Sequence, residues 1–64
     1  MVQVKFYSRP AYETQLPHTY DGSLSMPRND IATPSALAAH ARALDCLPDV
    51  LAVIDGDIAT AFRL

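Results

Sequence analysis

The chain has 64 residues, of which 50% are apolar and 19% are charged. This length excludes a two-domain enzyme, a nucleotide-binding α/β unit with its crossover connections and a long repeat array, so we expect one compact domain over residues 1–64. A domain this short buries only about 60% of the surface that its unfolded chain exposes, and its stability as a monomer is marginal. Such domains usually add disulfides, a metal ion or a partner chain. This chain has one cysteine and no cluster of metal ligands, so we expect a partner chain to supply the additional stability.

The charge balance argues against a nucleic-acid partner. Five basic residues against seven acidic ones give a net charge of −2, and the basic residues are scattered singly rather than in the stripe that neutralises phosphates. Four aspartates fall close together in the sequence, at Asp45, Asp49, Asp55 and Asp57. They indicate either a solvated helix exit and hairpin tip or an acidic patch that faces a basic partner.

The cysteine content and the apolar segments predict a cytoplasmic protein without a membrane partner. Cys46 is the single cysteine, so it has no intrachain disulfide partner, and a reducing compartment is expected. Residues 1–9 alternate in polarity and lack the apolar segment of a signal peptide. The longest strongly apolar run, residues 50–54, is far shorter than the roughly 20 residues that span a bilayer.

The first predicted element is a strand over residues 1–7. Val2, Val4 and Phe6 alternate with polar positions, which is typical of a half-buried strand, and Pro10 ends the pattern. Residues 11–33 are irregular. They fit either a hairpin whose tip is Asp21-Gly22 or a functional loop.

The next predicted element is a helix that starts at Thr33 and Pro34. Threonine suits the N-cap, proline suits the first helical position, and an alanine-rich run continues to Cys46. We expect Pro48 to end the helix, because the residue before a proline is forced out of the α region. The buried stripe of this helix comprises Leu37, Ala41, Leu44 and Leu47.

Residues 50–64 predict a hairpin with Asp55-Gly56 as a two-residue turn. This register places Asp57 opposite Ile54 and divides the side chains between two faces of the sheet. The face beneath the helix then carries Leu51, Val53, Ile58, Thr60, Phe62 and Leu64. The opposite face carries Val50, Ala52, Ile54, Asp57, Ala59, Ala61 and Arg63, and it is largely apolar although nothing in the chain covers it.

These elements predict an α+β fold in which one helix packs on one face of a small, mainly antiparallel sheet, in the order β-(β-β)-α-β-β. The uncovered face is the expected protein-binding surface. Tyrosines are favoured at interfaces because they bury a large area and keep a polar tip, so two of them join the predicted site. The predicted protein-binding residues are Val50, Ala52, Ile54, Ala59, Ala61, Arg63, Tyr7 and Tyr12.

No residue pattern predicts a catalytic, cofactor or metal site. His40 borders the helical stripe and fits an edge position between helix and sheet, and His18 lies three residues before Asp21, as a His–carboxylate dyad or two ends of a hairpin. Cys46 follows the negative end of the helix, so we expect no lowering of its pKa and no nucleophilic role. Residues 55–57 resemble the start of a calcium loop but lack the downstream glutamate.

Three functions fit these observations. The first is a small non-enzymatic interaction or regulatory protein, such as an inhibitor of a larger host protein. It would use its apolar sheet face, or an exposed edge of the sheet, to bind that protein or a second copy of itself. The second is an acidic decoy that blocks a nucleic-acid-binding protein, whose binding would weaken steeply with salt. The third is a subunit of a small oligomeric enzyme with His18 or His40 as proton carrier.

Overall fold

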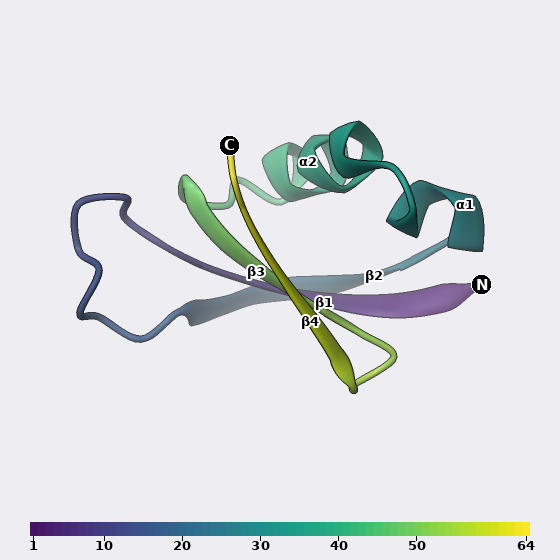
Figure 1. Ribbon diagram of the computed structural model, residues 1–64, viewed down its shortest axis with the longest axis horizontal. Coiled ribbons are helices and arrows are strands. Elements are labelled where there is room, and N and C mark those ends of the chain that lie inside the picture. The colour runs from purple at the N-terminus through teal and green to yellow at the C-terminus, as the bar shows by residue number, and fades with distance from the viewer.

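The computed structural model describes all 64 residues and forms a single four-stranded sheet with two short helices (Figure 1). The elements in chain order are β1 (Val2–Arg9), β2 (Thr19–Met26), α1 (Arg28–Ile31), α2 (Pro34–Ala43), β3 (Asp49–Ile54) and β4 (Ile58–Arg63). All neighbouring strands are antiparallel, in the order β2-β1-β3-β4. Both helices lie on the same side of the sheet, and the other side is bare. The predicted α+β class, a helix on one face of a small antiparallel sheet, is confirmed.

The core lies between α2 and the sheet. In β1 every second side chain is buried, as the alternation of Val2, Val4 and Phe6 predicts, and α2 contributes Leu37 and Ala41. Aliphatic side chains from β2 and β3 complete the layer. The full cluster comprises Val2, Val4, Phe6, Met26, Leu37, Ala41, Val50, Ala52 and Ile54.

The segment 11–33 supplies one strand rather than a hairpin of its own. Asp21-Gly22 lies inside β2 instead of at a turn. The pairing register of β1 and β2 shifts at this point: Phe6 faces Gly22, but the next residue, Tyr7, faces Tyr20. Asp21 is therefore an extra residue, a β-bulge, and Gly22 has a φ of 150° that favours glycine. A single strand that pairs along β1 satisfies more backbone groups than a separate two-stranded hairpin, which is marginal by itself.

Helix α2 begins where the sequence predicts but ends earlier. Its N-cap is Thr33, although the threonine hydroxyl donates to the carbonyl of Asn29 at 3.2 Å rather than capping the helix. At the other end Asp45 adopts a φ of 57°, its N–H donates to the Arg42 carbonyl, and the Cys46 N–H donates to the Ala41 carbonyl. This pair of bonds is a Schellman motif, which ends the helix before Pro48 exerts any effect.

The final hairpin has the predicted turn but a different register. Asp55 and Gly56 have φ values of 53° and 72°, and the Asp57 N–H donates to the Ile54 carbonyl at 3.0 Å. Ile58, however, stands opposite Ile54, because Asp57 is inserted as an extra residue after the turn. A shift of one residue moves the side chains of one strand to the other face relative to those of its neighbour.

The exchanged faces correct part of the predicted binding surface. Val50, Ala52 and Ile54 are 0%, 0% and 6% exposed and lie beneath α2, so their assignment to the uncovered face is wrong. The cause is the pairing of β3 with β1, in which Ala52 faces Phe6, a residue that already points into the core. Leu51 and Val53 take the outward positions instead.

Candidate interaction surface

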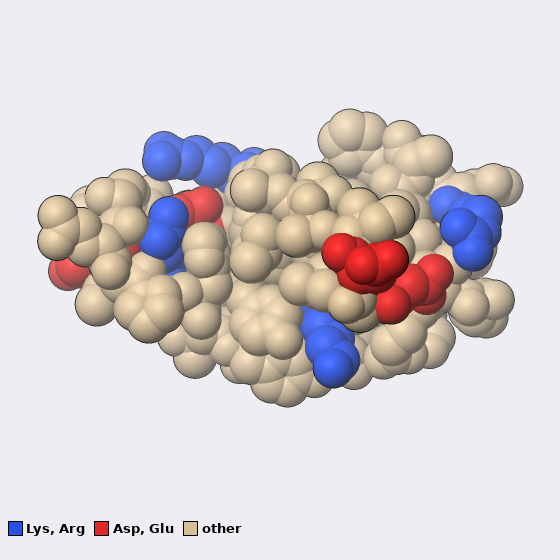
Figure 2. Space-filling view, turned by 60° about the horizontal axis from the view of Figure 1, so that its bottom comes forward, with Lys and Arg blue, Asp and Glu red and all other residues tan.

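The candidate site is the side of the sheet that the helices leave uncovered, to which all four strands contribute. We call it the far face. It consists of Gln3, Lys5, Tyr7, Arg9, Tyr20, Ser23, Ser25, Asp49, Leu51, Val53, Ala59, Ala61 and Arg63. Figure 2, which brings the underside of Figure 1 forward, shows a mostly uncharged surface with basic side chains that lie apart and one group of acidic side chains right of centre.

An apolar row crosses the centre of the far face from one edge to the other. Tyr20 faces Tyr7, Tyr7 faces Leu51, and Leu51 faces Ala61. The two tyrosine rings lie with centroids 5.3 Å apart and planes tilted by 58°, a favourable aromatic arrangement. A second row beside it contains Val53 between Lys5 and Ala59.

The structure places some of the predicted binding residues on this face and not others. Ala59, Ala61, Arg63 and the half-buried Tyr7 belong to the far face. Tyr12 is 84% exposed but lies in the loop between β1 and β2.

Sequence reasoning missed Leu51, Val53 and Tyr20. The alternation of β1 identifies Lys5 and Tyr7 as outward-pointing. The residues that face them across the strands also point outward and include all three, but the strand pairing that brings them there has no signal in the sequence pattern.

One end of the far face is organised around an ion pair. Arg9 Nε lies 2.6 Å from Asp49 Oδ2, and Arg9 Nη1 donates to the Leu16 carbonyl at 2.8 Å, which ties the β1–β2 loop to the sheet. The hydrogen bond from Arg9 holds the pKa of Asp49 below its usual value, and the charges of Arg9, His18 and Arg63 act in the same direction while burial opposes them. Asp49 is therefore a fixed partner of Arg9.

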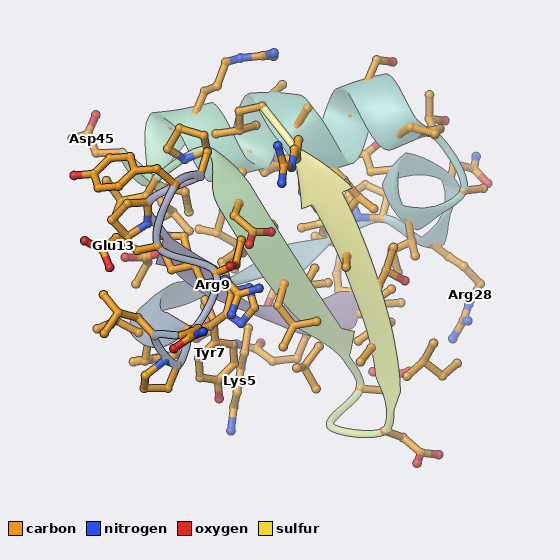
Figure 3. The ribbon with its side chains drawn as sticks, turned by 60° about the vertical axis from the view of Figure 1, so that its left-hand side comes forward. Lys5, Tyr7, Arg9, Glu13, Arg28 and Asp45 are labelled. Atoms are coloured by element: carbon orange, nitrogen blue, oxygen red, sulfur yellow. The ribbon has the colours of Figure 1, made fainter.

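The four aspartates do not form a single acidic patch, so that expectation is wrong. Asp49 is ion-paired in the sheet, and the length of β3 separates it from Asp55 by roughly 20 Å. Figure 3 shows Asp45 well away from the β3–β4 turn, where Asp55 and Asp57 lie. The dispersal removes the continuous acidic surface on which a nucleic-acid decoy would depend.

The far face instead has a positive formal charge. It carries three cations, Lys5, Arg9 and Arg63, and one carboxylate, Asp49, which gives +2 in a chain whose total is −2. Figure 3 shows Lys5 and Tyr7 extending from the same side of the sheet. The face thus combines an apolar and aromatic centre with basic residues around it.

A polar cluster lies at the same end of the sheet as Arg9 but on the helix side. Ser8 is 1% exposed; its hydroxyl donates to Asp21 Oδ2 at 2.5 Å and accepts the Leu47 N–H at 2.9 Å. Burial, followed by the hydrogen bond and charge of Asp21, raises the pKa of Cys46 to about 11. The prediction that this pKa is not lowered is confirmed. The cluster anchors the segment after α2 to β1 and β2.

The two histidines have separate carboxylate neighbours. His18 Nε2 lies 3.8 Å from Asp49 Oδ1 and not beside Asp21, so the dyad considered from the sequence is absent. His40 Nε2 lies 3.2 Å from Asp30 Oδ2, which links α2 to α1 rather than to the sheet.

No group of three or more histidine, cysteine, aspartate or glutamate side chains is arranged to hold a metal ion. Neither helix has the length and apolar character needed to cross a bilayer. Comparison of the chain with protein-family models, curated proteins and solved structures finds no match.

Proposed function

We propose that the protein is a non-enzymatic regulatory module that binds a larger protein through its far face and inhibits it, within the cytoplasm. The observation that carries the proposal is the apolar row formed by Tyr20, Tyr7, Leu51 and Ala61, over which no element of the chain packs. A sheet face that meets only water is normally polar. Tyrosine is also among the residues that most often anchor protein interfaces.

The dimensions of the far face support a small interface. Four strands about 4.8 Å apart and six residues long, at about 3.4 Å each, cover roughly 400 Å². A standard interface buries about 800 Å² on each partner. The partner must therefore also contact the margins of the face. The expected anchors are Tyr7 on the central strand β1 and Tyr20 beside it on the edge strand β2.

The charge of the far face defines the chemistry of the partner. Lys5 and Arg63 flank the apolar row, and Arg9 is neutralised by Asp49. A complementary surface has an apolar centre and acidic residues at its rim. Rim charges act mainly on the rate of association, so the association rate should fall with salt while the dissociation rate changes little.

The test compares variants of the intact chain in affinity capture followed by calorimetry with the captured partner. Val53→Glu places a charge on the far face without touching the free edge of β4, and Tyr20→Ala removes one aromatic anchor. Ala39→Glu, on the exposed side of α2, is the matched control for the added charge. We expect the partner to bind the control as it binds the natural chain, and both far-face variants to bind at least about tenfold more weakly.

The proposal fails if Val53→Glu, folded by circular dichroism, retains the partner at unchanged affinity. It also fails if Ala39→Glu alone abolishes binding, because the helical side of the molecule would then be the interface. Affinity that collapses with salt in both the association and dissociation rates would indicate a purely ionic contact rather than an apolar one.

A further inference from the structure

The two edges of the sheet differ in how well they are protected. The edge at β2 is interrupted by the bulge at Asp21 and by Gly22. The edge at β4 runs from Ile58 to Arg63 without proline, glycine or bulge, and its one charge stands at the end. Natural proteins block exposed edges with charges, prolines or bulges, because an open edge pairs with another strand. The edge at β4 has none of these devices before its last residue, Arg63.

The hydrogen-bond pattern identifies which backbone groups of β4 are free. The Leu64 N–H donates to the Pro48 carbonyl, so these two residues form a hydrogen-bonded pair at the end of the β3–β4 ladder. Such pairs alternate with non-bonded pairs along antiparallel strands. The N–H and C=O groups of Ala59, Ala61 and Arg63 therefore point away from β3, toward the open edge.

We propose that β4 pairs antiparallel with β4 of a second copy, about a two-fold axis at Thr60. In this register Ala59 faces the second copy's Ala61, and the two residues exchange hydrogen bonds between their free N–H and C=O groups. The two-fold axis repeats this pair on the other side of Thr60. Ile58 then faces the second copy's Phe62. Asp57, which follows the turn, lies opposite the second copy's Arg63.

Charge and exposure along β4 favour a second copy over an unrelated strand. Asp57 and Arg63 stand at opposite ends of the strand, so antiparallel pairing about Thr60 brings each to an opposite charge. Ile58 is 61% exposed, and the pairing supplies it with an aromatic neighbour. Ala59 and Ala61 leave room for close approach, and the bulged β2 edge prevents further growth of the sheet.

Pairing at this edge goes beyond the proposed function, because it rests on the backbone of β4 rather than on the far face. The product is a continuous eight-stranded sheet, and the helices of both copies lie side by side on the same side of it. If the far face binds no partner, the pairing of β4 is unaffected. If β4 does not pair, each molecule still has one far face with which to bind a partner.

Mass measurement and cysteine cross-linking of the full chain test both the assembly and its register. The natural chain should change from 7.0 kDa to twice that mass as its concentration rises. In a Cys46→Ala background, Thr60→Cys should form a covalent dimer under mild oxidation, because a non-hydrogen-bonded pair has Cα atoms about 4.5 Å apart, within disulfide range. Ala61→Cys is the control. Its Cα lies about 8 Å from its own symmetry mate, beyond that range.

A charge variant provides the second measurement. Asp57→Lys places a lysine opposite the second copy's Arg63 at two symmetric positions, and we expect the dimer to dissociate about tenfold more readily. Glu13→Lys makes the same charge change in the exposed β1–β2 loop and should leave the dimer unchanged.

Two results overturn the inference. One is a mass of 7.0 kDa for the natural chain even at millimolar concentration. The other is faster cross-linking of Ala61→Cys than of Thr60→Cys, which would place the two-fold axis at another residue.

Discussion

The register of the final hairpin makes a sharp prediction for two isoleucines that face each other. Ile54 and Ile58 form a cross-strand pair, yet Ile54 is 6% exposed and Ile58 is 61% exposed. We predict that Ile54→Ala strongly destabilises the protein and that Ile58→Ala destabilises it little. The register expected from the sequence, in which Ile58 lies beneath the helix and Ile54 points outward, predicts the opposite order.

The size of the effect follows from the buried carbon atoms. Each substitution removes three carbons, worth about 0.8 kcal/mol per buried methylene, so Ile54→Ala costs about 2 kcal/mol before a cavity is counted and about 3 kcal/mol with one. Ile58 loses only about two-fifths of its surface to burial, which gives about 1 kcal/mol. The loss of β-propensity is similar in both variants and cancels in the comparison. A chain of 64 residues has a total stability of about 3–10 kcal/mol, so the difference is measurable.

Urea and thermal unfolding followed by circular dichroism measure both variants, at a protein concentration where the mass remains 7.0 kDa. A difference of about 2 kcal/mol corresponds to a separation of Tm values of roughly 10 °C in a domain of this size. An unchanged urea slope would show that the variants differ in stability and not in the extent of unfolding. Equal Tm values, or a lower Tm for Ile58→Ala, would refute the structural register.

Two further predictions concern titrating groups. Arg9→Gln should raise the pKa of Asp49 toward the unfolded value of about 3.9. The ion pair stabilises the fold above that value, and its contribution is lost as the pH falls through the lower folded pKa. The variant should therefore be less stable at neutral pH, and its free energy of unfolding should change less as the pH is lowered. An unaltered Asp49 titration by carboxyl NMR would contradict this. Cys46, with a pKa of about 11 rather than 9.0, should be alkylated about 100-fold more slowly than a free thiol at neutral pH, and Asp21→Asn should increase the rate; a rate equal to that of a free thiol would count against the burial argument.

The parts of the fold that the sequence predicts are those with a strong local signal. Strand β1 shows uninterrupted alternation, and α2 opens with Thr33-Pro34, a pair suited to an N-terminus. The end of α2 carries no comparable signal, because Asp45 occupies a left-handed position that glycine usually fills. Asp21-Gly22 suits a tight turn and a bulge equally well, so the sequence does not distinguish the hairpin tip from the bulge that the structure has there.

The candidate site was partly predicted for a similar reason. The turn at Asp55-Gly56 is the predicted one, but the residue inserted at Asp57 is invisible to a pattern that counts in twos. The prediction placed Ala59 and Ala61 of β4 on the correct face, because the register error reversed the side chains of β3 alone. Long-range pairing with β1 decides which side of β3 is buried, and local propensity contains no information about that pairing.

The open edge and the far face are linked by geometry. One far face covers roughly 400 Å², about half of what a standard interface buries on each partner. Pairing through β4 joins two such faces into one sheet and brings Ala61 of each copy beside Ala59 of the other, so the two apolar rows approach each other across the two-fold axis. A dimer would then offer about 800 Å² of continuous surface with Arg63 of each copy near the seam. Asp57 lies outside the far face, so Asp57→Lys should weaken partner binding only at protein concentrations where it also dissociates the dimer. Val53→Glu changes the far face itself and should weaken partner binding at every protein concentration.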